Sequence, residues 1–271
     1  MSNKPTITQL KRQLRQKIKL RLSKIPQEQL YQQSIQIQQL ITPTPTSKYE
    51  FHQFPEFQKA KTIGLYMNMP QGELPTGPLI QSCFQQNKTV YLPRITKLGK
   101  FNQQELPRFQ EQKSILRFLK VDDLNEVENL IPRGKFKIRE PDFKTVDQNK
   151  NKNKNKNGNA SASASASASA SANGDVVVIN DLLSQGIKLD LLFVPGVAFD
   201  SNCYRMGHGV GFYDDFIKRY AEVHGEKPFL IGVGLKEQLV SGEDDEVLHT
   251  EEHDERLDCV IVGDKVFRRD N

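Results

Sequence analysis

The chain has 271 residues, a formal net charge of +5 and an isoelectric point near 8.9. This length fits one large α/β domain or two small ones, and the mildly basic balance suits an anionic ligand such as a nucleotide or a polycarboxylate. The sequence lacks the interleaved aromatic residues of a nucleic-acid-binding surface and any apolar run near the roughly 20 residues that span a bilayer, so neither nucleic acid nor a membrane is an expected partner.

The N-terminal residues predict a basic amphipathic helix. Apolar residues recur every three or four positions between Ile7 and Leu22, and Thr6 is placed to cap the helix. Residues 1–27 contain eight Lys or Arg and no acidic residue. This composition also occurs in mitochondrial presequences, but a solvated basic helix face is the simpler interpretation. A second helix is expected between Pro26 and Ile41.

Strand and helix patterns then alternate along the chain. Expected strands cover residues 63–67, 89–93, 114–121, 189–194, 228–235 and 257–262. Expected helices cover residues 76–84, a short segment capped by Asp122 and the segment after Gly211, whereas residues 132–141 are expected to form a loop. Such alternation predicts a mostly parallel sheet with helices on both faces. We therefore expect one three-layer α/β/α domain that spans residues 1–271.

Residues 147–174 interrupt this pattern with alternating Asn and Lys followed by alternating Ala and Ser. The segment carries no large apolar side chain, so burial cannot offset its ordering entropy, and we expect it to be disordered. Because ordered patterns flank it on both sides, we interpret it as an insert within the domain and not as a domain boundary.

The cysteine content bears on the cellular compartment. Cys83, Cys203 and Cys259 are few, odd in number and widely spaced, which is typical of a reducing environment. We therefore expect a cytoplasmic protein, with the mitochondrion as the weaker alternative. A monomer is expected as well.

Three alternating glycines form the leading candidate site. Gly207, Gly209 and Gly211 precede a helical pattern, and glycines at a helix start leave N–H groups open to an anion, which the helix dipole also favours. Their spacing matches neither of the common glycine-rich nucleotide motifs, so a tight turn without a ligand is the alternative. Arg205 can hold a phosphate in bidentate geometry, and Asp214 can hold a divalent metal that bridges phosphate oxygens.

The two segments VPGVAFD (194–200) and RMGHGVGFYD (205–214) closely resemble the signature of the 5-formyltetrahydrofolate cyclo-ligase family, also called 5,10-methenyltetrahydrofolate synthetases. The resemblance extends over nearly the whole chain outside the insert. Its other segments are KRQLR (11–15), MNMPQGELPT (67–76), YLPR (91–94), FKIREP (136–141) and EEHDERLD (251–258).

The resemblance implies two overlapping groups of ligand-binding residues. Those implied to contact ATP are Lys11, Arg12, Gln13, Leu14, Arg15, Arg205, Met206, Gly207, His208, Gly209, Val210, Gly211, Phe212 and Tyr213. Those implied to contact the folate are Arg15, Met67, Glu73, Phe136, His208, Gly209, Val210, Gly211 and Phe212, with Glu73 reading the donors of the pterin ring. Asp214 and Asp254 are implied to hold Mg²⁺. The ligands are expected in a cleft between the N-terminal helix and the glycine loop.

The implied reaction is the ATP-dependent closure of 5-formyltetrahydrofolate to 5,10-methenyltetrahydrofolate, with release of ADP and phosphate. The formyl oxygen is a poor leaving group until ATP phosphorylates it, after which N10 of the folate attacks the activated carbon and phosphate departs. The protein has to position two substrates and neutralise charge. No protein nucleophile is expected, so Cys203 is interpreted as a bystander. The sequence leaves open whether the folate carries a polyglutamate tail.

Four positions and the insert at residues 147–174 depart from the family pattern. Phe136 stands where the family usually has tryptophan, and it retains a flat ring that can stack on a substrate. Phe212 replaces the first tyrosine of a usual pair and removes one hydroxyl. His208 and Val210 fill positions that can be basic in relatives, and the apolar side chain of Val210 excludes a side-chain contact to phosphate.

Two other function classes are weighed against the cyclo-ligase. His249, Glu252 and His253 match the H-x-x-E-H pattern of inverted zinc proteases, which requires a helix that presents both histidines. The segment is a dense acidic run, and a solvated surface is the simpler interpretation. The third class is a non-catalytic nucleotide- or RNA-binding module built on the basic N-terminal helix.

Overall fold

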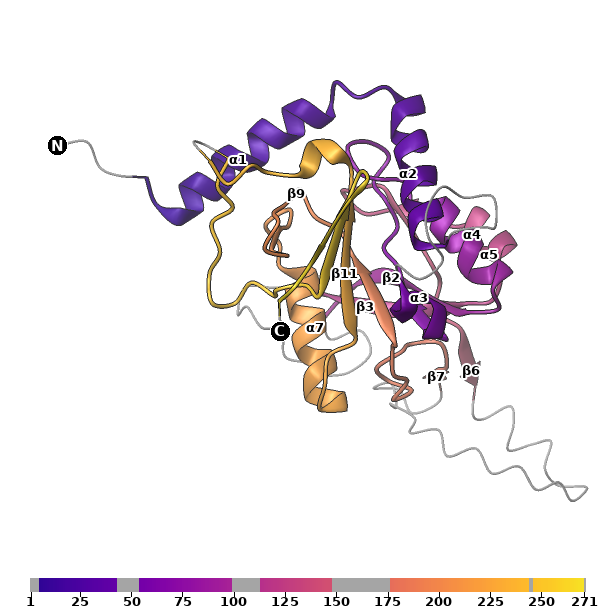
Figure 1. Cartoon of the computed structure of the whole chain (residues 1–271). Helices are drawn as coiled ribbons and strands as arrows, with labels where there is room; N and C mark the ends of the chain where they lie inside the picture. The colour runs from indigo at the N-terminus through magenta and orange to yellow at the C-terminus, as the bar shows by residue number, and fades with distance from the viewer. Residues whose placement is uncertain (1–4, 43–53, 99–112, 148–175, 244–245, 271) are drawn as a thin grey trace, which may run out of the picture.

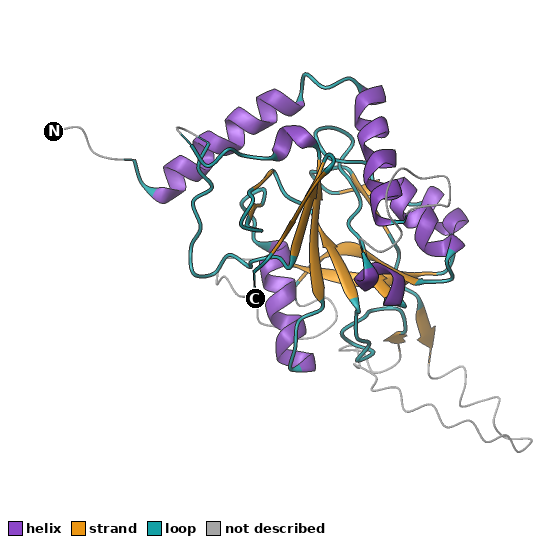
Figure 2. Ribbon diagram, in the orientation of Figure 1, coloured by secondary structure: helices purple, strands orange, loops and turns teal. Residues whose placement is uncertain are grey.

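The computed structural model describes residues 5–42, 54–98, 113–147, 176–243 and 246–270 (Figure 1). The central sheet has seven strands, and five neighbouring strands in its middle run parallel (Figure 2). In spatial order the strands are β13 (Lys265–Arg268), β12 (Cys259–Val262), β11 (Phe229–Gly234), β8 (Leu191–Val194), β1 (Thr62–Gly64), β2 (Thr89–Lys97) and β3 (Ser114–Val121). The edge strands β13 and β3 are antiparallel to their neighbours.

Helices cover both faces of the sheet. They are α1 (Ile7–Leu22), α2 (Gln27–Ile41), α3 (Pro55–Lys59), α4 (Gly77–Gln85), α5 (Leu124–Glu128), α7 (Phe212–His224) and the 3-10 helix η1 (Lys236–Gln238). Three two-stranded sheets complete the described structure: β4 (Ile131–Arg133) with β5 (Ile138–Glu140), β6 (Thr145–Asp147) with β7 (Val176–Val178), and β9 (Ala198–Phe199) with β10 (Arg205–Met206). None of the described helices has an apolar stretch long enough to cross a membrane.

The side chains of β8 alternate between the two faces of the sheet. Leu191 and Phe193 belong to the core cluster that includes buried residues of α1, α2 and α4. Leu192 and Val194 belong to a second cluster on the other face, together with Phe216 of α7. Successive strand residues point to opposite faces, so a fully apolar strand requires cover on both sides. The expected three-layer α/β/α fold is confirmed.

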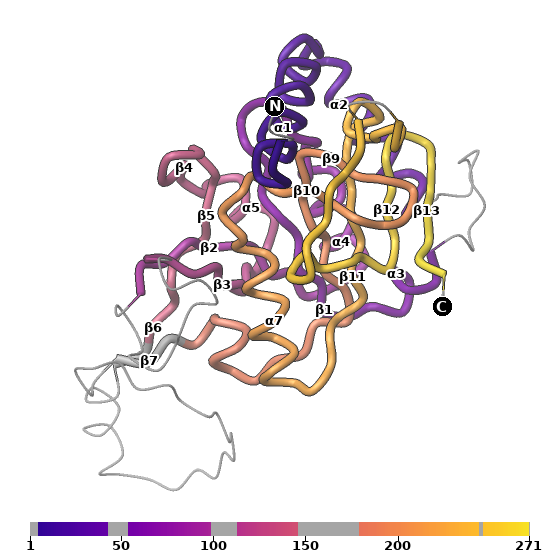
Figure 3. The backbone as a smooth tube through the Cα atoms, turned by 90° about the vertical axis from the view of Figure 1, so that its left-hand side faces the viewer, coloured from indigo at the N-terminus to yellow at the C-terminus, as the bar shows by residue number. Residues whose placement is uncertain are grey.

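The basic helix α1 lies across the edge of the sheet at which β8 and β11 end, beside the β9–β10 hairpin (Figures 1 and 3). It begins with a capping box, because Gln9 N–H donates to Thr6 Oγ1 at 3.2 Å and Thr6 N–H donates to Gln9 Oε1 at 2.8 Å. Leu14 and Ile18 bury its apolar face. The carboxyl ends of parallel strands form the usual ligand-binding edge of such folds, so α1 stands over that edge.

A cluster of glycines fixes the segment before the glycine loop. The ring of Phe199 is fully buried, and a Cβ atom added at Gly196, Gly232 or Gly234 would lie 2.7 Å from one of its atoms. Real Cβ contacts are longer than this, so these three positions accept only glycine unless the ring moves. This packing anchors the β9–β10 hairpin that leads into the glycine loop.

The structure corrects four local expectations. The strand expected over residues 63–67 ends at Gly64, where its pairing with both β2 and β8 ends. Residues 132–141 are not a loop: β4 and β5 pair as a hairpin, which their short, charged strands did not predict. The helix cap is Asp123, whose Oδ1 accepts from Glu126 N–H at 2.8 Å, whereas Asp122 pairs with Lys144. The strand expected to end at Pro93 continues to Lys97, because there it pairs with β3 alone and a missing N–H is tolerated.

The predicted insert, residues 147–174, lies outside the described residues except for Asp147, which ends β6. Its flanks are paired: Asp147 of β6 is opposite Val176 of β7 in an antiparallel ladder. A two-residue Asn-Gly turn is suited to join two strands at such a pair.

Replacing residues 148–175 by Asn-Gly is therefore expected to leave enzymatic turnover within about twofold of wild type. The shorter loop lowers the entropic cost of closure, so the free energy of unfolding is expected to rise by up to about 2 kcal/mol. Thermal unfolding and steady-state kinetics measure both. A Gly/Ser replacement of equal length is the control for composition. A large loss of stability or activity in either variant would show that the segment packs on the domain.

Candidate functional site

Two of the pockets in the described structure lie at the carboxyl edge of the sheet, one on each side of the glycine loop. The first, called the apolar pocket, is lined mainly by Met67, Met69, Pro93, Ile95, Leu116 and Phe136, and by Val210, Phe212 and Tyr213 from the loop and α7. The second, called the polar pocket, is lined by Thr8, Lys11 and Arg15 of α1, by Lys113 and Ser114 at the start of β3, and by Glu251, His253 and Asp254. Gly207, Val210, Gly211, Phe212 and Asp214 line both pockets. The glycine loop is thus their common wall.

The loop depends on the backbone freedom of two glycines. Gly209 has φ +95° and Gly211, the N-cap of α7, has φ +78°, values that other residues rarely adopt. Among the described residues, no side chain caps the first turn of α7. Its backbone N–H groups therefore remain available to an anion at the junction of the two pockets.

Arg15 brings α1 against this loop. Its Nε donates to the carbonyl oxygen of Gly207 at 2.8 Å, and its guanidinium carbon lies 3.5 Å from where a Cβ at Gly209 would be. A larger residue at Gly209 would therefore meet Arg15 as well as adopt a strained φ. The predicted encounter between the basic helix and the glycine loop is confirmed.

Lys11 connects the same helix to the C-terminal acidic segment. Its Nζ lies 2.7 Å from Glu251 Oε2 and 2.6 Å from Asp254 Oδ2, although the residue is only 7% exposed. Burial opposes the charge of Lys11, but its hydrogen bonds to Asp254 and Glu251 outweigh this effect and raise its pKa. Asp254 is thereby held in the polar pocket beside a positive charge.

Asp214 occupies the first turn of α7 and is paired with Arg205. Its Oδ1 accepts from Arg205 Nη2 at 2.7 Å and from Glu255 N–H at 3.4 Å. The Arg205 side chain is 4% exposed, and its buried Nε has no hydrogen-bond partner in the part of the chain that the structure describes. Arg205 faces the apolar pocket, while Asp214 borders both pockets.

The carboxylates of Asp214 and Asp254 both line the polar pocket, and each accepts a hydrogen bond from a cationic side chain. Oxygen donors of this kind suit Mg²⁺. Glu251 and His253 offer further ligand atoms beside Asp254, all within 4.8 Å of one another. The cluster of Glu251, His253 and Asp254 therefore offers ligand atoms that fit a hard divalent cation, and Asp214 lines the same pocket without being part of this cluster.

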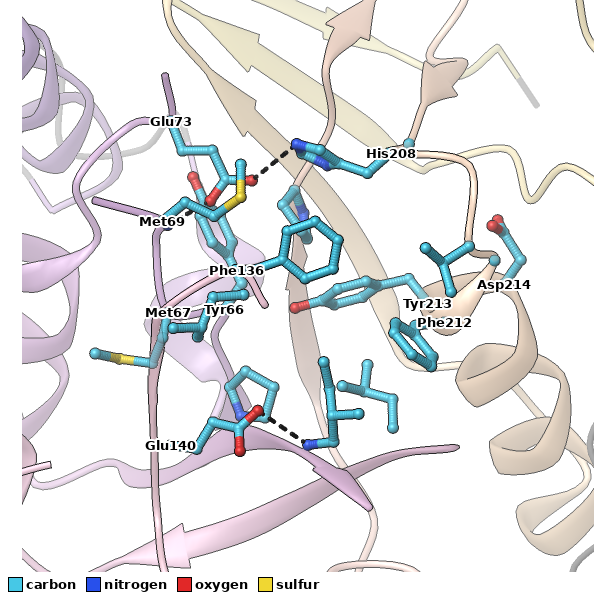
Figure 4. A pocket seen from close by; sticks show the side chains of 18 of the residues that line it. Tyr66, Met67, Met69, Glu73, Phe136, Glu140, His208, Phe212, Tyr213 and Asp214 are labelled. Carbon is cyan, nitrogen blue, oxygen red and sulfur yellow. Dashed lines mark hydrogen bonds and ion pairs between the residues drawn. The ribbon is translucent and has the colours of Figure 1, made fainter. Parts of the chain in front are cut away.

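Glu73 lies at one end of the apolar pocket, beside His208 (Figure 4). Its Oε2 accepts from Met69 N–H at 2.7 Å, and its Oε1 is 3.9 Å from His208 Nε2. Burial raises the pKa of Glu73 to about 7 and lowers that of His208 to about 4, where the nearby cations of Lys19 and Arg15 act in the same direction. At neutral pH His208 is therefore uncharged, and the pair is not an ion pair.

Aromatic rings form the walls between the two ends of this pocket. Phe136 projects from the β4–β5 hairpin toward His208, with ring centroids 6.1 Å apart, and the side chain of Tyr213 points into the same space (Figure 4). Met67 lies on the opposite strand-end segment after β1. The pocket can therefore enclose a flat heterocycle with a carboxylate at its end.

The structure places most predicted site residues at the two pockets, with four exceptions. Arg12 and Gln13 are exposed on α1 and line neither pocket. Leu14 and Met206 are buried in the core cluster that includes residues of α1, α2 and α4. Because α1 turns about 100° per residue, Lys11 and Arg15, four residues apart, share with Thr8 the face toward the loop, whereas Arg12, Gln13 and Leu14 do not. The contacts of all these residues with ATP or folate remain predictions.

Sequence reasoning missed several lining residues. In the polar pocket these are Thr8, Lys113, Ser114, Glu251 and His253. In the apolar pocket the missed polar residues are Tyr66 and Glu140. Glu140 belongs to the FKIREP segment, so the motif could have identified it. Lys113 lies at the site only because β3 pairs in register with β2.

The zinc-protease alternative lacks its structural requirement. Residues 249–253 contain no helix, so His249 and His253 are not presented on one helical face. Two acidic residues near His253, Glu251 and Asp254, are instead engaged by Lys11. The pattern does not form the metal site that its spacing indicates.

The chain is similar to known proteins in both sequence and fold. Residues 7–155 and 164–263 match the model of the 5-formyltetrahydrofolate cyclo-ligase family. The chain is 30% identical over 207 residues to a 5-formyltetrahydrofolate cyclo-ligase of Saccharomyces cerevisiae, covering 76% of this chain and 77% of the relative. It is 26% identical to the Mus musculus cyclo-ligase, covering 96% of each chain. The solution structure of Aquifex aeolicus 5,10-methenyltetrahydrofolate synthetase has the same fold, with a TM-score of 0.58, 22% identity and coverage of 97% and 94%.

Proposed function

The chain belongs to the 5-formyltetrahydrofolate cyclo-ligase family, and from this premise we propose that its apolar pocket binds 5-formyltetrahydrofolate and its polar pocket binds ATP. The reaction is the ATP-dependent cyclisation to 5,10-methenyltetrahydrofolate with release of ADP and phosphate. The observation that supports this assignment most directly is the wall shared by the two pockets. Direct transfer between two substrates requires such contact.

The residues of each pocket then have separate tasks. In the polar pocket, Arg15 and the first-turn N–H groups of α7 neutralise the phosphates as charge moves toward the leaving ADP. In the apolar pocket, Phe136 and Tyr213 hold the pterin and exclude water, while Glu73 accepts its ring donors. The formyl oxygen attacks the γ-phosphorus at the shared wall. N10 then attacks the formyl carbon, and phosphate leaves with the electron pair of the C–O bond.

Asp214 and Asp254 are the residues we assign to Mg²⁺. Bound Mg²⁺ would neutralise negative charge on the phosphate oxygens of ATP. Lys11 and Arg205 already contact these carboxylates in the structure, so bound Mg²⁺ would share or replace these contacts.

The experiment that tests the function is spectrophotometric. The folded protein is mixed with MgATP and 5-formyltetrahydrofolate, and the absorbance of the methenyl product is followed. Product formation that requires ATP supports the proposal. Its absence would overturn the proposal, and ATP binding without folate-dependent turnover would favour the nucleotide-binding module.

Arg15→Ala is expected to raise the KM for ATP by about 10- to 100-fold, because it removes a charge-assisted contact worth roughly 1.5–3 kcal/mol. It also frees the carbonyl of Gly207, which loosens the loop. Lys24→Ala is the matched control, since it removes one positive charge from an exposed position beyond the end of α1. Steady-state kinetics with varied ATP measure both. An unchanged KM and kcat in Arg15→Ala would count against α1 as part of the nucleotide site.

We further propose that the protein acts as a cytoplasmic monomer on folates with or without a polyglutamate tail, and that nucleic acid is not a partner. Its three cysteines are buried free thiols, which supports a reducing compartment.

A further inference from the structure

A second buried carboxylate stands in the apolar pocket without an assigned task. Glu140 ends β5 and lies at the far end of the pocket from Glu73, with Phe136 and Tyr213 between them (Figure 4). Its side chain is 7% exposed. The surrounding lining is apolar, including Ile95 and other side chains of the pocket floor. Ionised carboxylates are rarely kept in such surroundings without full pairing.

Glu140 is held in place but is not saturated with hydrogen bonds. Its Oε1 accepts from Ile95 N–H at 3.3 Å, and its Oε2 lies 3.5 Å from Arg94 Nε. Both contacts are longer than the usual charge-assisted distance of roughly 2.7–2.9 Å. Two carboxylate oxygens offer about four acceptor sites, so Glu140 retains capacity toward the pocket.

Electrostatics support a carboxylate that can take up a proton. Burial raises the pKa of Glu140, while the Ile95 N–H, Arg94 and Arg133 act in the opposite direction. Both arginines are shared with Asp142, to which Arg133 Nη2 donates at 2.6 Å and Arg94 Nη1 at 3.5 Å. They therefore counter the charge of Glu140 only in part.

The proposed reaction needs a proton acceptor. When N10 attacks the formyl carbon, the N10–C bond forms with the nitrogen lone pair, and N10 must release its hydrogen as a proton. The C–O bond to the phosphorylated oxygen breaks, and phosphate departs with that electron pair. The N5 lone pair then completes the amidinium of the product. No step is a redox step, and the one proton has to leave through a base near N10.

Substrate shape determines which end of the pocket N10 faces. The donor edge of a pterin and the carbon arm that carries N10 lie on opposite sides of the bicyclic ring. With the donor edge at Glu73, the arm points to the other end, where Glu140 lies (Figure 4). We propose that Glu140 accepts the N10 proton during ring closure. This inference rests on the proposed function and adds a catalytic residue to it.

The other ionisable groups of the pocket suit this task less well. His208 lies beside Glu73, at the pterin end. Asp214 is engaged by Arg205 at the shared wall. Burial raises the pKa of the Tyr213 hydroxyl, with the charge of Glu73 acting in the same direction, so the phenol is not a base at neutral pH.

Glu140→Gln tests the proposal because phosphorylation precedes proton loss. Rapid-quench measurements are expected to show one equivalent of ADP per enzyme formed at nearly the wild-type rate, followed by methenyl formation slowed about 10²- to 10³-fold, the usual contribution of a general base. The KM for the folate is expected to change only a few-fold. Glu128→Gln, the same replacement at an exposed residue of α5, is the control.

Two results would overturn the inference: methenyl formation at the wild-type rate, or an increase in folate KM with unchanged kcat, which would make Glu140 a binding residue. A Glu140→Asp variant keeps the charge and is expected to recover part of the methenyl rate, so it tests the proposal if glutamine impairs folding. Thermal unfolding monitors that possibility. A wild-type protein that forms no methenyl product contradicts the proposed function itself and is thereby distinguished from failure of this inference.

Discussion

Replacing Asp214 by asparagine is expected to lower turnover with saturating folate and MgATP by on the order of 10³-fold, because a metal ligand contributes several kcal/mol of charge stabilisation. Asparagine keeps the size of the side chain and an oxygen that can accept from Arg205. It removes the negative charge that a hard cation needs. The fold is therefore expected to survive while the chemistry does not.

The measurement is kcat as a function of Mg²⁺ concentration, together with thermal unfolding. Glu222→Gln is the matched control, since it removes one negative charge from the exposed side of the same helix. A shift of the Mg²⁺ requirement to higher concentration, accompanied by the loss of kcat, identifies a metal ligand. Near-normal activity of the Asp214 variant at saturating Mg²⁺ would refute the assignment.

The layer architecture was predictable because the informative pattern is local. Strands such as β8, apolar at four successive positions, require cover on both faces, and this alone indicates an α/β/α arrangement. The buried stripe of α1 was equally clear from its spacing.

Other elements depend on pairing that a local pattern does not encode. The β4–β5 hairpin has three-residue strands and one proline, and it turns through Gly134 and Lys137 at positive φ. Edge strand β13 is mostly exposed and carries no apolar run. Such short strands exist because a neighbour supplies their hydrogen bonds.

In the candidate site, too, residues of one continuous segment were predictable, and residues that the fold brings in from distant segments were not. The three glycines and Asp214 were predicted from one continuous segment of sequence, and the family resemblance added the residues between them. Lys113 and Glu251 reach the polar pocket from distant parts of the chain, and only the sheet and the Lys11 contact bring them there. A sequence motif also contains residues that pack the helix onto the core and do not reach a ligand. Leu14 is an example, because it is buried in the core cluster.

Glu73→Gln is expected to reduce kcat/KM for 5-formyltetrahydrofolate by on the order of 10²- to 10³-fold, since buried donors of the pterin would face an amide in place of a carboxylate. Glutamine also offers one acceptor oxygen where glutamate offers two, and Met69 N–H already uses one oxygen of Glu73. The loss is expected in folate binding and turnover, whereas the KM for ATP changes little.

The same substitution is expected to stabilise the free protein in a pH-dependent way. Burial raises the pKa of Glu73 to about 7 from an ordinary value of 4.5. Between these two values the folded state binds more protons than the unfolded state, so the free energy of unfolding falls as pH rises from 4.5 to 7. The pKa shift of Glu73 corresponds to a total loss of about 3 kcal/mol in the free energy of unfolding. Glutamine carries no charge at any pH and does not lose this stability.

Denaturant unfolding of both proteins at pH 4.5 and pH 7.5 measures the difference. The variant is expected to gain up to about 3 kcal/mol on wild type between the two pH values, while its activity falls. Glu222→Gln, at an exposed carboxylate, is expected to change neither quantity with pH. A variant whose stability difference from wild type is the same at both pH values would show that Glu73 is not buried as a charge. A Glu73 variant that is more stable than wild type but inactive would show that the carboxylate lowers the stability of the fold and is needed for folate binding and turnover.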